Sequence, residues 1–247
     1  MIASLPMYLR PQNRSAHDTL WTYIRDAMRD HGVEAPEGLD HDMHHMVGWA
    51  RPDLVLGQIC NLPYRAQFRE NVTTLCAMDY EIPGSPAGFY HSVFVVRDDD
   101  PAQSPVDAAT YRFAYNEPLS NSGYGAPQLW AASRGFQFSP FMHTHAHRNS
   151  IEAVATGKAD ICAIDAHTFW IDRDLELMNS VKVIGRTHDT PGMTLITRAG
   201  QDRAPYLVAI RQALGAVPRA IKSELRLRGI VELPASAYDI PMPNIPA

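Results

Sequence analysis

The strongest constraint on the fold is the order of apolar segments along the chain. The continuous apolar run from Asp53 to Cys60 lies between two prolines and is typical of a strand buried on both faces. The segment from His17 to His31 instead carries apolar residues at helical spacing, with charged residues on its other face. Because strand-like and helix-like segments alternate in this way over most of the chain, we predict an α/β fold built from βαβ units.

Two segments look like connections between lobes. The strand predicted over Tyr90–Val96 is followed by a Pro- and Ser-rich linker, Arg97–Pro105, which indicates a first crossing. The polar segment Thr187–Gly192 indicates the return crossing. The C-terminus, with Pro241, Pro243 and Pro246, is expected to be extended.

The length of 247 residues suits two lobes rather than one core. We expect lobe 1 to contain residues 1–96 and 193–247, and lobe 2 to contain residues 97–192. Each lobe is expected to hold a mixed sheet flanked by helices. Ligands of open α/β sheets bind at the carboxyl ends of strands, so we expect a cleft between the lobes that closes by hinge motion.

Composition and charge exclude several classes of partner. A net charge of −5 offers no basic field for nucleic acid or for an acidic membrane surface. No apolar run approaches the ~20 residues that a membrane span needs, so membrane insertion is not expected. Met1 leads directly into the first predicted strand with no signal peptide ahead of it. As the sequence stands, a cytoplasmic protein is expected, or a periplasmic one if a leader has been removed.

The cysteines predict neither a zinc site nor a redox motif. Cys60, Cys76 and Cys162 are widely spaced, form no Cys-x-x-Cys pair and have apolar neighbours. We predict buried, reduced thiols.

The stretch Asn116–Tyr124 is the most informative one for function. It follows an apolar strand and precedes a helical run, so its hydroxyl and amide side chains stand where a helix leaves backbone N–H groups unpaired. Gly123 allows close backbone approach, and the helix dipole favours an anion at this point. The alternative is an ordinary N-cap, in which Ser122 begins the helix and nothing binds.

Two further polar residues are predicted near this stretch. His147 is expected at the end of one strand and Asp165 at the end of the next, both at the ligand-binding edge of the sheet. The alternative for Asp165 is a cap for the helix that begins at Ala166.

These segments resemble the phosphate-, phosphite- and phosphonate-binding proteins of bacterial ABC importers, a branch of the type 2 periplasmic-binding-protein fold. The resemblance is specific from about residue 88 to 170 and loose in the N-terminal third. It is carried by these motifs: Tyr90-His-Ser-Val-Phe-Val-Val96; Asn116 with Ser120-Asn-Ser-Gly-Tyr124; Thr144-His-Ala-His147; Ser150-Ile-Glu-Ala-Val154; Gly157-Lys-Ala-Asp160; and Asp165 before Trp170.

The resemblance implies a set of ligand-binding residues. By this resemblance, oxyanion oxygens would be held by the stretch that ends at Tyr124, with Ser120, Asn121, Ser122 and Gly123 as donors. Tyr90 and His147 would add further donors, and Asp165 would face the substituent that the oxyanion carries. Residues of the first lobe form the other wall, namely Tyr8 and Gln58 or Tyr64. The implied partners are a small anionic ligand and, if the protein is exported, an ABC transporter permease.

The chain departs from the pattern at two positions. Asn121 stands where the relatives have a threonine, which changes the donor geometry, and His145 stands where they have a glycine. A different or larger ligand is compatible with both changes.

The histidines raise the question of a metal. His143, His145 and His147 alternate, so they share one face if the strand persists, and one face of histidines can hold a metal. A zinc site usually recruits a ligand from another segment, and this spacing is not a common signature. We therefore expect no metal and no cofactor, and we read Asp40–His45 as a solvated loop.

Three classes of function remain. The first is a non-catalytic solute-binding protein that closes on a phosphonate- or phosphate-like oxyanion. The second is a cytoplasmic enzyme of lyase or dehydratase type on the same fold, with His147 and Asp165 as acid and base. The third is a sensor, but no output domain is evident. Since the sequence has no activated nucleophile and no cofactor loop, we favour the binding protein.

Overall fold

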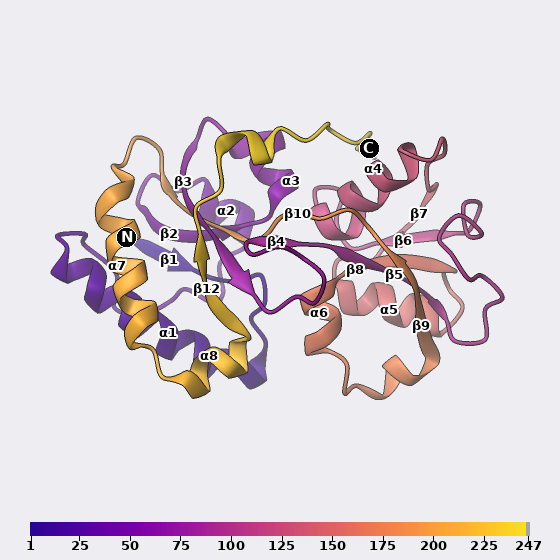
Figure 1. Ribbon diagram of the computed structural model, residues 1–247, viewed down its shortest axis with the longest axis horizontal. Coiled ribbons are helices and arrows are strands. Elements are labelled where there is room, and N and C mark those ends of the chain that lie inside the picture. The colour runs from indigo at the N-terminus through magenta and orange to yellow at the C-terminus, as the bar shows by residue number, and fades with distance from the viewer. Residues whose placement is uncertain (246–247) are drawn as a thin grey trace. The chain divides into compact units, whose positions relative to one another are not determined.

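The computed structural model describes residues 1–245, which form two compact α/β units (Figure 1). The first unit comprises Met1–Pro83, Ala87–Phe89 and Pro191–Tyr238. The second comprises Gly84–Pro86, Tyr90–Thr190 and the described part of Asp239–Ala247. Pro246 lies outside the described residues. Each unit contains one five-stranded mixed sheet, as the sequence predicts.

The sheet of the first unit has the strand order β1-β2-β11-β3-β12. β1 and β2 are parallel, whereas β11 runs antiparallel to β2 and β3, and β12 runs antiparallel to β3. Every residue of β2 is buried, which confirms the prediction from its uninterrupted apolar run. The strands are β1 (Ile2–Ser4), β2 (Leu54–Ile59), β3 (Val72–Tyr80), β11 (Thr194–Arg198) and β12 (Leu227–Val231).

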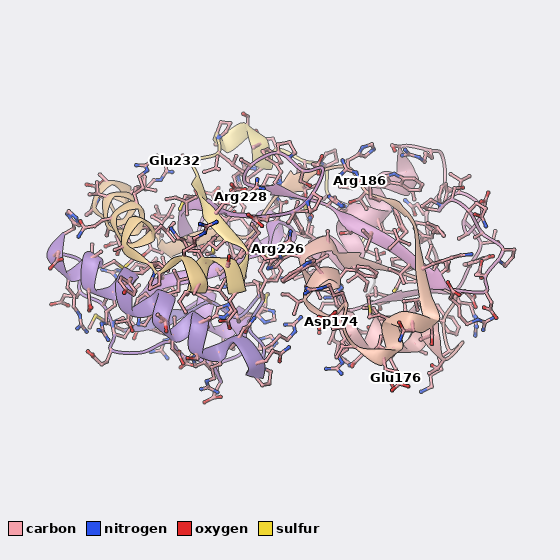
Figure 2. All side chains as sticks on the ribbon, turned by 60° about the horizontal axis from the view of Figure 1, so that its bottom comes forward. Asp174, Glu176, Arg186, Arg226, Arg228 and Glu232 are labelled. Carbon is pink, nitrogen blue, oxygen red and sulfur yellow. The ribbon has the colours of Figure 1, made fainter. Side chains whose placement is uncertain are left out.

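Helices cover the sheet of the first unit. The predicted helix is present as α1, and its buried residues recur at spacings of three and four. α1 packs against α7 and α8 (Figure 1). The charged residues Arg226, Arg228 and Glu232 flank or lie on β12 (Figure 2). The helical segments are η1 (Pro11–Asn13), α1 (Arg14–Asp30), α2 (His45–Trp49), α3 (Asn61–Pro63), η2 (Tyr64–Phe68), α7 (Arg203–Ala216), α8 (Arg219–Leu225) and η5 (Ala235–Tyr238).

The sheet of the second unit has the order β7-β6-β8-β5-β9. β6 is parallel to β7 and β8, while β5 is antiparallel to β8 and β9. The strands are β5 (Ser92–Arg97), β6 (Phe113–Tyr115), β7 (Pro140–His143), β8 (Ile161–Asp165) and β9 (Val181–Arg186). The helical segments are η3 (Asn121–Gly125), α4 (Ala126–Ala132), α5 (His147–Ala155), α6 (Ala166–Ile171) and η4 (Glu176–Ser180).

Alternation along the strands gives the second sheet two buried faces. Phe94 and Val96 of β5 point to the same side as Trp130 of α4, whereas Val95 points to the side covered by Ile151 of α5. Because helices cover both faces, β5 and β8 are apolar along most of their length. This packing fixes the starts of α4 and α5 relative to the same sheet.

The first crossing between the units lies earlier in the chain than the sequence indicates. β5 pairs with β8 and β9, so it belongs to the second sheet, and Arg97–Pro105 remains inside the second unit. The chain passes between the units at Pro83–Tyr90, at Thr190–Pro191 and once more at Tyr238–Asp239. Two short strands mark the first two of these points, β4 (Phe89–Tyr90) and β10 (Thr190–Pro191). The predicted linker is instead a loop of the second unit.

Two further sequence predictions concern burial and membranes. The three cysteines are buried thiols, as predicted, and burial raises the pKa of Cys76 to about 12. No helix within residues 1–245 has both the length and the apolar character that crossing a bilayer requires.

Candidate anion site

The helix that carries the predicted anion site begins earlier than its periodicity indicates. Ser120 is the N-cap, with extended backbone, and its Oγ accepts a 3.0 Å hydrogen bond from the Gly123 amide. The Ser120 carbonyl accepts from the amides of Tyr124 and Gly125. A π-turn, η3, therefore precedes α4, and Ser122 lies inside the first turn rather than at the cap.

Ser122 and His147 meet at the starts of two helices. The Ser122 Oγ and the His147 Nε2 share a hydrogen bond of 2.7 Å, and the Ser120 Oγ lies 3.4 Å from the Ser122 Oγ. His147 is the first residue of α5 and not the last residue of a strand, because β7 ends at His143. The N-terminal ends of η3 and α5 therefore converge on one small region, where both helix dipoles are positive.

Gly123 is required by close approach rather than by its backbone conformation. A Cβ atom at this position would lie 1.8 Å from the Asn116 Oδ1 and 3.2 Å from the His147 Cε1. The sequence assigns to Gly123 a close approach to a ligand, whereas these neighbours are side chains of the same unit. The Asn116 Oδ1 is buried and has no hydrogen-bond partner among residues 1–245.

Asn121 and Tyr90 form a buried hydrogen-bonded pair at the start of η3. The Asn121 Nδ2 donates to the Tyr90 Oη at 2.9 Å and to the Thr190 Oγ1 at 3.0 Å. Asn121 is fully buried and Tyr90 nearly so. Asn121 thus holds the first turn of η3 against the segments that begin and end the second unit.

Ser92 and Thr190 bond to residues of the candidate site, although the sequence does not single them out. The Ser92 Oγ donates to the Ser122 carbonyl at 2.9 Å, and Ser92 is buried. Ser92 is the serine of the Tyr-x-Ser motif, so the motif itself was the available signal. Thr190 belongs to no such motif, so the sequence does not indicate its role.

Asp165 caps a helix. Its Oδ1 accepts from the amides of His167 at 2.8 Å and Thr168 at 3.0 Å, at the junction of β8 and α6. The carboxylate is buried, and these bonds match the capping alternative.

Tyr124 points into the core rather than toward Ser122. Its ring packs edge-on against Tyr115 at 5.3 Å, and its Oη donates to the Asn244 carbonyl at 2.9 Å. Burial raises the pKa of Tyr124.

The three residues predicted in the first lobe lie in the first unit, where two of them share a neighbour. The Tyr8 ring packs edge-on against Tyr80 at 4.8 Å, and the Gln58 Nε2 donates to the Tyr80 Oη at 2.9 Å. Tyr64 packs instead against Tyr238 at 5.2 Å. A separate hollow of about 530 Å³ in the first unit contains none of these three residues.

A second polar cluster lies at the edge of the second unit. Arg186, at the end of β9 (Figure 2), contacts the His91 Nδ1 at 3.2 Å and the Asp189 carboxylate at 3.2 Å. The Ser85 Oγ lies 2.8 Å from the His91 Nδ1 and donates to Asp189. Burial lowers the pKa of His91, Arg186 lowers it further, and Asp189 opposes both. The hydroxyl bonds to the carboxylate, so this is not the arrangement of a catalytic triad.

The fold recurs in several solved structures. PhnD1 from Prochlorococcus marinus in complex with methylphosphonate is 12% identical with a TM-score of 0.73, and the match covers 96% of this chain and 94% of that one. XAC2383 from Xanthomonas citri bound to chloride ion is 18% identical with a TM-score of 0.72, covering 96% and 93%. A binding protein component of an ABC phosphonate transporter, PA3383 from Pseudomonas aeruginosa, is 15% identical with a TM-score of 0.71, covering 96% and 82%. These likenesses show a two-lobed periplasmic-binding-protein fold.

The sequence itself identifies the family. No curated protein gave a significant match. A family model described as ABC transporter, phosphonate, periplasmic substrate-binding protein matches residues 52–238, which is most of the chain. The chain therefore belongs to the family of periplasmic substrate-binding proteins of phosphonate ABC transporters.

Proposed function

We propose that the protein binds a small phosphonate- or phosphate-like oxyanion at the start of η3, and that it acts in the periplasm with an ABC transporter permease. The family supports the ligand class and the compartment, since its description names a phosphonate transporter and a periplasmic substrate-binding protein. Methylphosphonate, the ligand of the PhnD1 structure, is the natural first probe.

The hydrogen bond between Ser122 and His147 carries the proposal. It brings two helix starts together, and helix starts favour anions through unpaired amides and the dipole. When the imidazole donates to the Ser122 Oγ, the hydroxyl hydrogen of Ser122 is available to an anion. Mostly neutral donors suit a tetrahedral oxyanion, because they bind its charge without a buried counter-ion.

The other predicted residues take supporting roles in this proposal. Ser120 contributes a second hydroxyl beside Ser122. Asn121 and Tyr90 hold the first turn of η3 in place. The Asn116 Oδ1 is a buried acceptor, which suits the P–OH group of a singly protonated phosphonate or phosphate.

The enzyme alternative gains no support from these contacts. It needs His147 and Asp165 as an acid–base pair, yet Asp165 caps α6 and His147 bonds to Ser122. The family and the solved relatives named above are binding proteins.

Affinity for methylphosphonate, phosphate, phosphite and sulfonates, measured by thermal shift and calorimetry, tests the proposal. Hydrogen bonds to charged groups contribute roughly 1.5–3 kcal/mol, so S122A and H147A are each expected to weaken binding by about 10- to 100-fold. The matched control is S133A, which removes a hydroxyl from the other end of the same helix. Unchanged affinity in both S122A and H147A would remove the site.

A further inference from the structure

A glutamate and two histidines gather where β6 and β7 end. β6 and β7 are parallel neighbours, and Tyr115 pairs in register with His143, so both strands end at the same edge of the sheet. Glu117 follows β6, and His145 follows β7 by two residues. β7 is an edge strand, which leaves this corner open to solvent.

The possible ligand atoms of the three side chains lie close together. The His143 Nε2 lies 3.0 Å from the Glu117 Oε2, and the His145 Nδ1 lies 3.7 Å from the Glu117 Oε1. One ligand atom from each residue lies within 4.8 Å of the other two. With metal–ligand bonds of about 2.0–2.2 Å, ligand atoms around a tetrahedral ion stand roughly 3.3–3.6 Å apart. The two histidine contacts, 3.0 Å to the Glu117 Oε2 and 3.7 Å to its Oε1, lie on either side of this separation, so small side-chain rotations bring one Glu117 oxygen and the two imidazole nitrogens to these distances.

A plain hydrogen-bonded cluster explains only part of this geometry. The 3.0 Å contact between His143 and Glu117 is an ordinary hydrogen bond. The 3.7 Å contact of His145 is too long for one, although it suits two ligands of a single cation. The two imidazole rings also lie 4.0 Å apart, and His143 is held by stacking on Tyr115.

The backbone explains why three alternating histidines do not form the site. His145 adopts φ +66°, in the left-handed region, so the strand does not persist beyond His143. His147 is therefore the first residue of α5, where it bonds to Ser122. Glu117, from a separate segment, instead adds a carboxylate beside His143 and His145.

We propose that Glu117, His143 and His145 bind one divalent first-row transition cation, with zinc as the representative ion. Imidazole nitrogen with one carboxylate suits Zn²⁺, Co²⁺, Ni²⁺ and Cu²⁺, whereas Ca²⁺ and Mg²⁺ prefer all-oxygen sites. The His145 side chain is 72% exposed, so the remaining coordination positions are taken by water. Different side chains form the proposed oxyanion site, so the two proposals can fail separately.

The test is a zinc titration of tag-free, EDTA-treated and dialysed protein against a chromophoric chelator. We expect one tight equivalent per chain and no competition by Ca²⁺ or Mg²⁺. Loss of outer-shell partners alone weakens metal sites by about 10- to 100-fold, so E117Q, H143A and H145A are each expected to weaken zinc binding at least 10-fold. Bound Co²⁺ should give visible absorption bands that H143A removes.

Two control variants separate this site from general histidine binding and from the oxyanion site. His44 and His45 form another stacked imidazole pair, with ring centroids 4.4 Å apart, and H44A should leave zinc affinity unchanged. S122A should also retain zinc affinity. Absence of a stoichiometric zinc site, or equal affinities in H143A, H145A and wild type, would overturn the proposal.

Discussion

At the scale of single residues, the site depends on groups whose partners are distant in sequence. The pattern around Ser122 and His147 predicted that these side chains matter, and the structure joins them directly. The hydrogen bonds of Asn121 could not be predicted from the local sequence, because its partners Tyr90 and Thr190 lie 31 and 69 residues away. A short sequence segment predicts where a helix starts. It does not predict which distant hydroxyl groups will accept hydrogen bonds from a buried asparagine side chain.

Gly123→Ala tests the close packing at this helix start. The new Cβ would lie 1.8 Å from the Asn116 Oδ1, so we expect a loss of about 1–3 kcal/mol in the free energy of unfolding, as in overpacked cores. Asn116→Ala in the same chain should recover part of the loss. Chemical denaturation measures both effects. The control is G215A in α7, where a Cβ meets nothing within 4 Å and stability should be equal or higher.

At the scale of elements, the strands and helices were mostly predictable and their ends were not. The apolar runs predicted β2 and β5, and the helical spacing predicted α1. The start of η3 was misplaced, because a π-turn capped by Ser120 breaks the helical period. The end of β7 was misplaced because the left-handed conformation of His145 stops an alternation that the sequence continues.

Substitution of Asp165 tests how much its capping bonds to α6 contribute to the free energy of unfolding. Asp165→Ala removes the acceptor of two amides, and we expect a loss of about 1–2 kcal/mol in unfolding free energy. Asp165→Ser keeps an oxygen at the cap and should recover a substantial part. Equal stability of D165A and wild type would contradict the capping role.

At the scale of the whole molecule, the sequence predicted two α/β units but misplaced the first crossing. The Val-rich segment Tyr90–Val96 is apolar on both faces, so it fits the buried interior of either sheet. Only its pairing with β8 and β9 assigns it to the second unit. Strand pairing over long sequence separations is the information that periodicity lacks.

Stability should fall with acidification, because both units contain a buried histidine with a lowered pKa. Burial lowers the pKa of His17 and of His91 from the ordinary value of 6.5. The unfolded chain then binds more protons below pH 6.5, so the free energy of unfolding decreases as pH falls from 6.5 toward the lowered values. Denaturation between about pH 5 and pH 8 measures this slope. H17Q and H91Q should each flatten it, and an unchanged slope in both variants would contradict the assignment.

A crystal structure of the protein with methylphosphonate would show whether the anion binds at Ser122. We expect a phosphonate oxygen within hydrogen-bonding distance of the Ser122 Oγ, with the ligand at the starts of η3 and α5 and His147 bonded to Ser122. Density for the ligand at any other place, such as the hollow of the first unit, with the Ser122–His147 bond undisturbed, would contradict it.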